Sequence, residues 1–273
     1  MLTLIASAII TLGGHAAEPA TNWHEKAFFG LHFDLHPNPS DKELGKDTTY
    51  EHIRAELEKA KPDFVQYDCK GHSGWSGYPT KVGSPAPGIV NDALKVWRKV
   101  TKDMGIPLSI HYSGVWDTRA IELHPDWARV DERGHPSKDN TCPLSGYQDE
   151  LLIPQLVEVV KEYDIDGMWI DGENWASAPC FCDRCKAEFT KRTGVKEIPL
   201  KRSDANWAEW LAFQRNLFTE HVTRYANAVH KVKKTCLVCS NWMYSVRMPE
   251  PVTAPVDYLS GDFDPSFGAE RAC

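Results

Sequence analysis

The sequence predicts an α/β fold, and within that class a (β/α)8 barrel that stops after about six strands. Strand-like runs alternate with helical stretches about six times, which is the order of successive βαβ units. Four of the strands end in groups of polar and aromatic residues, as the C-terminal rim of a barrel does. No glycine-rich dinucleotide loop follows the first strand. A complete barrel has eight strands, so we expect the barrel in these 273 residues to be incomplete.

Each predicted strand is a short apolar or alternating run bounded by turn residues. The six runs cover residues 28–36, 63–69, 106–117, 167–170, 236–242 and 257–264. Amphipathic helices are expected between them; Thr48 or Thr49 caps the first, Asn91 or Asp92 caps the second, and Gly105 stops the second. These helices cover residues 49–59, 91–104, 148–163, 185–192 and 207–233. Residues 118–147 read as a long irregular segment, which in a compact domain is usually functional or tied by a metal.

The first twenty residues, 1–20, are typical of an export signal. Residues 2–12 are an apolar run, and the small residues Gly14, Ala16 and Ala17 resemble a cleavage site. The apolar run is too short to span a bilayer as a mature helix. We therefore expect a periplasmic or secreted protein whose single domain covers residues 21–273.

Composition narrows the class of partner. The hydrophobic content of 42% is ordinary for a globular domain and excludes a disordered chain. The net charge of −7, without a long basic run, argues against nucleic acid or a membrane as a partner. Ten Trp residues suit stacking on sugar rings, although Trp also fills cores. The oligomeric state stays open, with a homo-oligomer as one option.

The segment 164–175 has the strongest chemical signal in the chain. Its short apolar strand, 167–170, leads directly into Asp171 and Glu173, with Gly172 between them. Two carboxylates at one barrel rim suit glycoside cleavage, in which one meets the anomeric carbon and the other serves the leaving oxygen. The alternative is that these acids only cap the following helix. The neighbouring aromatics and the other polar strand ends favour the catalytic interpretation.

Four strand ends together resemble a glycoside hydrolase barrel. The resemblance runs from about residue 28 to 264 and lies in segments 29–36, 68–81, 111–117 and 166–172. The most similar group is the α-L-fucosidase-like family 151, with family 29 fucosidases more distant. In family 29 the nucleophile ends the fourth strand in a Trp-Phe-Asp-Gly-like motif, and Trp169-Ile170-Asp171-Gly172 matches it here.

The resemblance also implies which residues hold the sugar. Family 29 uses a His on the first strand and a Lys-His-His-like segment after the second. The nearest positions here are His32 or His36, and Lys70 with His72, whereas Asp34 and Gly71 depart from the pattern. The full set of expected substrate contacts is His32, Asp34, His36, Lys70, His72, Tyr112, Trp116, Asp117, Trp175 and Asp262. His111 is expected either in sugar binding or in a network at the rim.

The resemblance implies a retaining, exo-acting α-L-fucosidase that cleaves terminal fucose from oligosaccharides or glycans and needs no cofactor for catalysis. Asp171 attacks the anomeric carbon, and a second carboxyl protonates the leaving oxygen and then activates water. Glu173 is the nearest candidate for the second role. Asp262 and Asp264 are rivals, and Asp117 is a weaker one.

Four cysteines carry a second resemblance. Cys180, Cys182 and Cys185 are similar in spacing to a cysteine cluster that follows the acid/base of family 42 β-galactosidases, and Cys142 matches an earlier cysteine there. In that family the four thiols bind a structural zinc, and Glu173 would be the acid/base. Four thiols can form a tetrahedral zinc site, whereas disulfides are the alternative in an exported protein. A β-galactosidase-like enzyme is therefore one competing hypothesis. A non-catalytic carbohydrate-binding barrel is the other.

Overall fold

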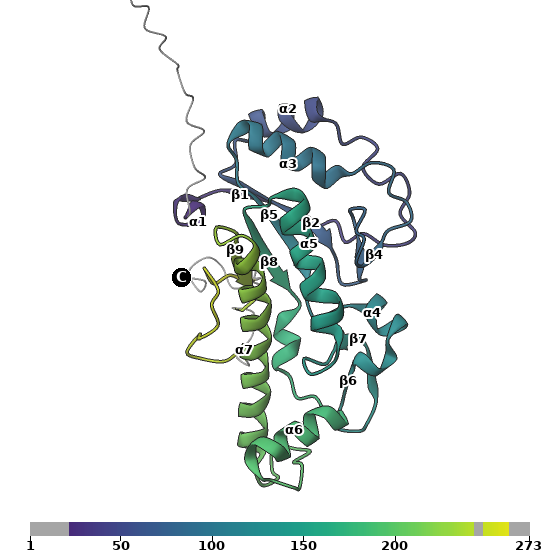
Figure 1. Ribbon diagram of the computed structural model, residues 1–273, viewed down its shortest axis with the longest axis vertical. Coiled ribbons are helices and arrows are strands. Elements are labelled where there is room, and N and C mark those ends of the chain that lie inside the picture. Colours follow the sequence, from purple (N-terminus) through teal and green to yellow (C-terminus); the bar gives the residue numbers. More distant parts are fainter. Residues whose placement is uncertain (1–21, 243–247, 262–273) are drawn as a thin grey trace, which may run out of the picture.

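A parallel sheet of five main strands forms the centre of the protein. The computed structural model describes residues 22–242 and 248–261, with the side chains of residues 174 and 175 left out. The strands lie in chain order from one edge to the other (Figure 1): β1 (Gly30–Phe33), β2 (Phe64–Lys70), β5 (Leu108–Ser113), β8 (Gly167–Asp171) and β9 (Leu237–Ser240). A short strand, β3 (Trp75–Ser76), pairs antiparallel with β2 and parallel with β4 (Ser84–Pro85).

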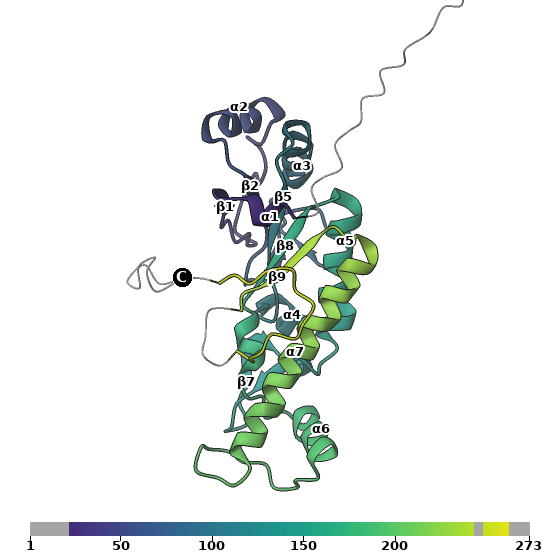
Figure 2. The same ribbon diagram turned by 90° about the vertical axis from the view of Figure 1, so that its left-hand side faces the viewer.

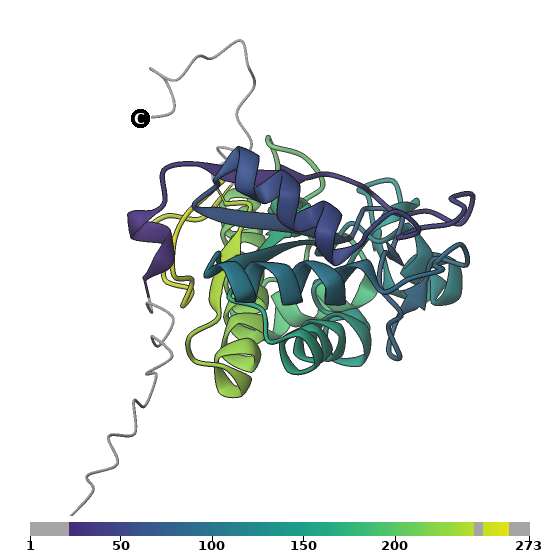
Figure 3. The ribbon, with the colours of Figure 1, turned by 90° about the horizontal axis from the view of Figure 1, so that it is seen from above.

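Helices follow the strands as βαβ units require. The crossover helices are α2 (Tyr50–Ala60), α3 (Ala93–Met104), α5 (Ile153–Tyr163) and α7 (Trp207–Val232), and α3, α5 and α7 lie side by side along one face of the sheet (Figure 3). The expected caps are present: Thr49 Oγ1 accepts from the backbone N–H of His52, and Asp92 Oδ1 accepts from that of Lys95. Gly105 ends α3 in a left-handed conformation.

Shorter elements fill the connections. They are α1 (Trp23–Lys26), α4 (Thr118–Leu123), α6 (Asp183–Thr193), a 3-10 turn at Pro125–Trp127, a π-helical turn at Gln148–Leu152, a 3-10 turn at Glu173–Ser177, and the hairpin of β6 (Ala128–Val130) with β7 (Pro136–Thr141). The expectation of an irregular segment over residues 118–147 is therefore wrong. Elements of three to six residues are too short to give the hydrophobic period that reveals a longer helix or strand.

The predicted α/β class and parallel barrel-type sheet are confirmed. Of the sixth expected strand, the described residues contain one parallel bridge, between Asn241 and Ser260. Within the described residues the sheet does not close on itself. The expected export signal, 1–20, lies outside the described residues, and no described helix is long and apolar enough to cross a membrane.

The two faces of the sheet have different chemistry. Leu108, Ile110 and Tyr112 of β5 belong to the main hydrophobic core, which packs between the sheet and its helices. Because side chains alternate along a strand, His111 and Ser113 point to the opposite face, which we call the inner face. The registers Asp68–His111–Trp169 and Ser113–Asp171 extend this inner face across β2, β5 and β8. Polar groups from three strands thus meet at the carboxyl ends of the strands.

A second hydrophobic core lies apart from the sheet. It joins α6, the first half of α7 and the segment around Cys142. Its buried members are Cys142, Cys180, Phe181, Cys182, Cys185, Phe189, Trp210, Phe213 and Leu217. In Figure 2 α6 lies at one end of the molecule, beyond the sheet. The buried residues of this second core therefore pack against one another and not against the main core.

Candidate active site

Asp171 is the last residue of β8, and three hydrogen-bonding partners and a fourth side chain, His72, converge on its carboxylate. Oδ1 accepts from Asn241 Nδ2 at 2.7 Å and from the Gly172 backbone N–H at 2.6 Å. Oδ2 lies 3.2 Å from His111 Nε2 and 3.3 Å from His72 Nε2. The Asp171 side chain keeps 13% of its surface exposed, so a ligand can reach it from the inner face.

These contacts determine the charge of Asp171. Burial opposes ionisation, but the hydrogen bonds from His111 and Asn241 outweigh it and hold the pKa of the Asp171 carboxyl well below its usual range. The carboxylate is therefore ionised at neutral pH. An ionised, oriented carboxylate is what nucleophilic attack on an anomeric carbon requires.

His111 connects Asp171 to a second carboxylate, Asp68. Its Nδ1 lies 2.9 Å from Asp68 Oδ1, and the side chain is 1% exposed. Burial alone would lower the pKa of His111, but the hydrogen bonds to Asp171 and Asp68 overcome this and raise it to about 9. His111 is therefore an imidazolium at neutral pH.

The other histidines of the inner face gather beside His111. The His32 ring lies 5.4 Å and the His36 ring 5.5 Å from the His111 ring, centroid to centroid. The His72 ring stacks on Trp116 at 4.2 Å with an angle of 5° between the planes. Burial lowers the pKa of His72, and the nearby Asp171 offsets this in part.

The structure thus brings together five of the expected substrate contacts. They are His32, Asp34, His36, His72 and Trp116, with Asp34 in contact with His36 Nε2. The Trp175 side chain, Asp262 and Asp264 lie outside the described residues, so their expected roles stay predictions.

Lys70, Tyr112 and Asp117 are placed differently from the expectation. Lys70 Nζ donates to Asp117 Oδ2 at 2.7 Å and to Tyr147 OH at 3.1 Å, and these three side chains and that of Tyr112 are buried. The register of β2 shifts between Asp68 and Lys70, so Lys70 pairs with Tyr112 on the helix side of the sheet. The expectation that Lys70, Tyr112 and Asp117 contact substrate is corrected accordingly: they belong to a buried network behind the sheet.

Glu173 is also placed differently from the role expected of it, that of an acid/base beside Asp171. Its carboxylate is fully buried: Oε1 accepts from the Val115 backbone N–H at 3.0 Å, and Oε2 lies 2.8 Å from His221 Nε2 on α7. The contact with His221 is close but not aligned as a hydrogen bond. Gly172 adopts a left-handed φ of 70°, which ends the alternation that would have placed Asp171 and Glu173 on one side.

Sequence reasoning gave no role to Asp68 or Asn241. It left His111 with two possible roles, in sugar binding or in a network at the rim. The signal for Asp68 and His111 was present, because each lies near the end of a predicted strand. Their pairing depends on the register of β2 against β5, which local patterns do not reveal.

The four cysteines predicted to bind metal do come together. Cys142 Sγ lies 3.6 Å from Cys182 Sγ and 3.5 Å from Cys185 Sγ, and all four sulfurs lie within 4.8 Å of one another. Zinc bonds of about 2.3 Å in a tetrahedron place sulfurs about 3.8 Å apart, so the spacing fits. All described cysteines are free thiols. The four thiols hydrogen-bond to one another, which lowers the pKa of Cys182 and raises that of Cys185.

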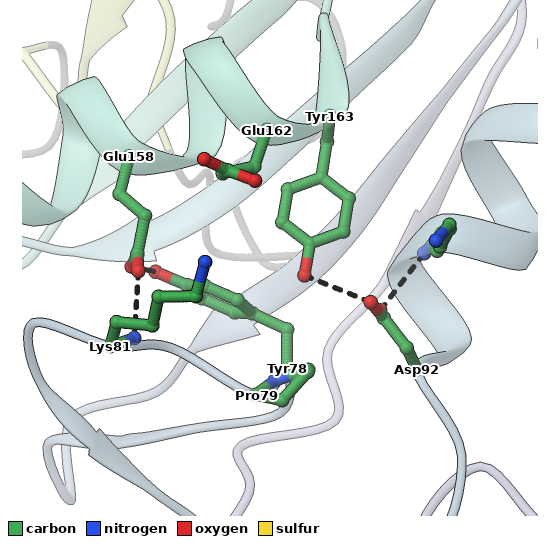
Figure 4. A pocket seen from close by; sticks show the side chains of 8 residues that line it. Tyr78, Pro79, Lys81, Asp92, Glu158, Glu162 and Tyr163 are labelled. Carbon is green, nitrogen blue, oxygen red and sulfur yellow. Dashed lines mark hydrogen bonds between the residues drawn. The ribbon is translucent and has the colours of Figure 1, made fainter.

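A separate hollow lies behind the sheet, between α3, α5 and the segment 78–81 (Figure 4). Its volume is about 170 Å³. Two of its carboxylates are paired: Glu158 accepts from the Lys81 backbone N–H at 2.7 Å, and Asp92 Oδ2 accepts from Tyr163 OH at 3.1 Å. None of the predicted site residues lines it, so the inner face around Asp171 remains the candidate active site.

Fold and site resemble those of barrel glycosidases. Residues 49–172 match the model of a family described as hypothetical glycosyl hydrolase 6. This match confirms the resemblance to glycoside hydrolases that the strand ends indicate. No curated protein sequence matches the chain.

Solved glycosidase structures share the fold. An α-L-fucosidase isoenzyme 2 from Paenibacillus thiaminolyticus superimposes with a TM-score of 0.67 at 22% identity, over 80% of this chain and 33% of that one. A β-galactosidase from Halorubrum lacusprofundi superimposes with a TM-score of 0.62 at 13% identity, over 86% of this chain and 39% of that one. A β-galactosidase from Marinomonas ef1 superimposes with a TM-score of 0.63 at 12% identity, over 86% of this chain and 40% of that one. The chain thus spans about a third to two fifths of the length of these proteins.

Proposed function

We propose that the chain carries the nucleophile side of a retaining glycosidase, with Asp171 as the nucleophile. The observation that carries this proposal is the Asp171 carboxylate, which is ionised, partly exposed and held by His111, Asn241 and the Gly172 N–H. The match to a glycosyl hydrolase family over residues 49–172 supports the same class of reaction.

In this mechanism one Asp171 oxygen attacks the anomeric carbon while the bond to the leaving oxygen breaks. The other oxygen becomes the carbonyl of the glycosyl ester and keeps its hydrogen-bond donors. Water then attacks the same carbon, and the electron pair of the ester bond returns to Asp171. A second carboxyl must protonate the leaving oxygen and later take a proton from water.

We assign only the nucleophile. Glu173 and Asp117, two of the acid/base candidates, are both buried: Asp117 pairs with Lys70, and Glu173 lies against the Val115 N–H and His221. Asp262 and Asp264 keep their place as candidates, because they lie outside the described residues.

For the substrate we propose the α-L-fucoside of an oligosaccharide. The motif around Asp171 supports it, and so do His32, His36 and His72, which stand nearest to the positions that the fucosidase resemblance implies. A β-galactoside is the second candidate, favoured by the cluster of Cys142, Cys180, Cys182 and Cys185. The burial of Glu173 weighs against that candidate, because Glu173 would be its acid/base.

We further propose that these four cysteines hold a structural zinc ion. The support is the sulfur spacing and the free thiols described above. Zinc would cross-link the Cys142 segment to the start of α6 and would take no part in the sugar chemistry. In an exported protein, coordination would also protect the thiols from oxidation.

The test of the nucleophile is chemical rescue. We expect the wild-type chain to release aryl alcohol from an aryl α-L-fucoside and Asp171→Gly to lose at least about a thousandfold in kcat. Azide should restore turnover in Asp171→Gly by entering the space of the lost carboxylate, giving a glycosyl azide. Asp164→Gly is the matched control: this exposed residue already adopts a left-handed φ of 51°, so glycine should cost little and azide should change nothing.

Each other outcome decides against part of the proposal. Cleavage of the β-galactoside with Glu173→Gln inactive would favour the β-galactosidase hypothesis. A folded protein that binds sugar but cleaves neither the aryl α-L-fucoside nor an aryl β-D-galactoside would favour a carbohydrate-binding barrel.

A further inference from the structure

Asp68 is a buried carboxylate on the inner face of β2 to which the proposed mechanism gives no role. Its side chain is 0% exposed. Oδ1 lies 2.9 Å from His111 Nδ1, and Oδ2 accepts from the His36 backbone N–H at 2.6 Å. Burying a carboxylate is costly unless its oxygens are paired with donors, and both oxygens are paired here. Asp68 therefore fixes two histidines at once.

His111 lies between two carboxylates. Its Nδ1 faces Asp68, and its Nε2 faces Asp171 Oδ2 at 3.2 Å. A neutral imidazole carries one N–H, so it can donate to only one of these two groups and would turn a lone pair toward the other. Only the doubly protonated ring satisfies both carboxylates.

We propose that Asp68 is a positioning residue that keeps His111 doubly protonated, with its Nε2–H directed at Asp171. The role of Asp171 in this inference rests on the proposed glycosidase function, whereas the Asp68–His111 contact does not. The raised pKa of His111, about 9, agrees with the geometry.

The other charged groups around His111 do not supply what Asp68 supplies. From β1 and the segment after it, His32 and His36 face the ring, and Asp34 is in contact with His36. From the segment after β2, His72 lies beside Asp171. A proton on any of these histidines would oppose the charge on His111. Of the described acids, Asp68 and Asp171 are the two that contact the ring directly.

This arrangement should act mainly on the second chemical step. When water attacks the anomeric carbon, the bond to the Asp171 oxygen breaks and its electron pair returns to the carboxylate. An imidazolium at Oδ2 stabilises that departing negative charge. In the first step the same cation stabilises the carboxylate before attack, so its benefit there is smaller.

The direct test is NMR of ¹⁵N-histidine-labelled protein across pH, with the His111 signals assigned through His111→Gln. In the wild type we expect both His111 nitrogens to be protonated at about pH 7.5, with titration near pH 9. In Asp68→Asn the titration midpoint should fall to the ordinary histidine range around pH 6.5 or below. Asp166→Asn is the matched control: Asp166 is also buried, accepts from the Leu108 N–H at 2.9 Å and pairs with Arg98, but it contacts no histidine.

Kinetics gives an independent measurement. Asp68→Asn should lower kcat on an aryl glycoside at least tenfold and lower KM with it, because the glycosyl-enzyme accumulates; a burst of released aryl alcohol should appear. Asp166→Asn should show neither change per folded molecule.

The inference is overturned if wild-type His111 is neutral at about pH 7.5. The same holds if its titration is unchanged in Asp68→Asn, or if stoichiometric Mn²⁺ broadens the His111 and His36 signals, which would place a cation between these groups. The wild-type measurement needs no variant to fold. If no glycoside is cleaved, the proposed function fails while the spectra still decide whether Asp68 controls His111.

Discussion

Asp171 and Glu173 stand two residues apart and have opposite surroundings. Asp171 faces the inner face of the sheet with part of its surface open, whereas Glu173 is fully buried beside His221 and the Val115 N–H. The left-handed backbone at Gly172 separates them, because it redirects the chain at the end of β8. One carboxylate is therefore available for chemistry, and the other holds the segment after β8 against α7.

Exchange of Glu173 for glutamine tests this division. We expect Glu173→Gln to lower the free energy of unfolding by about 2 kcal/mol, because the buried Val115 N–H loses its charged acceptor and the close contact with His221 is disturbed. Turnover per folded molecule should stay within a few-fold of the wild type. Urea denaturation and kinetics normalised to folded protein measure the two effects.

Glu158→Gln serves as the control for this exchange. The Glu158 carboxylate also accepts hydrogen bonds, from Thr80 and the Lys81 N–H, but it is only partly buried, so the same substitution should cost clearly less. A Glu173→Gln protein of wild-type stability that has lost turnover would return Glu173 to the acid/base role.

Residue-level prediction from sequence succeeded where a motif and strand alternation agreed. His32 and Asp171 stand on the inner face as the pattern indicates. It failed at Lys70 because a register shift in β2 turned the side chain to the other face. A one-residue slip reverses the facing of a strand, and nothing local in the sequence announces it.

At the scale of elements, caps made the helices predictable. Thr49, Asp92 and Gly105 bound α2 and α3 close to the positions that their residue types indicate. The hairpin of β6 and β7 was missed, since Ala128–Val130 is too short to alternate. Length, more than composition, separated the elements that could be found from those that could not.

Gly172 is the element boundary with the greatest effect on the site. We expect Gly172→Ala to destabilise the fold by more than about 1 kcal/mol, the usual cost of a side chain at a left-handed φ. The added Cβ would also lie 3.0 Å from Trp116 Cβ, so the Trp116–His72 stack must shift. Unfolding curves and near-ultraviolet circular dichroism measure the two effects.

Gly194→Ala is the matched control for this boundary. Gly194 ends α6 with φ 79°, and an added Cβ there would meet nothing within 4 Å. It should carry the backbone cost alone and leave the aromatic signal unchanged. Equal losses of stability, with no spectral change in either variant, would contradict the role given to Gly172.

At the scale of the whole molecule, the described chain has two hydrophobic cores, and the sequence predicted only one of them. The core between sheet and helices follows from the βαβ order. The second core joins Cys142 to residues far along the chain, and helix periodicity does not show which residues meet across that distance. The cysteine spacing was its one signal, and it indicated a ligand set without indicating the Phe and Trp side chains around it.

Removal of metal should therefore affect one core and spare the other. We expect the purified chain to contain about one zinc ion, measured by elemental analysis, and a strong chelator to remove it. Hydrogen exchange should then rise at least about tenfold in α6 and the first half of α7, because their packing around the four sulfurs is lost. Exchange in β2, β5 and β8 should change little, since none of the four cysteines lies in the main core.

The variant Cys182→Ser should reproduce the effect without chelator. The control is Cys239→Ser, at a buried cysteine of β9 outside the cluster, and this variant should keep the zinc. Protein without zinc, or exchange that rises equally in both cores, would show that the cysteines do not form an independent metal-held unit.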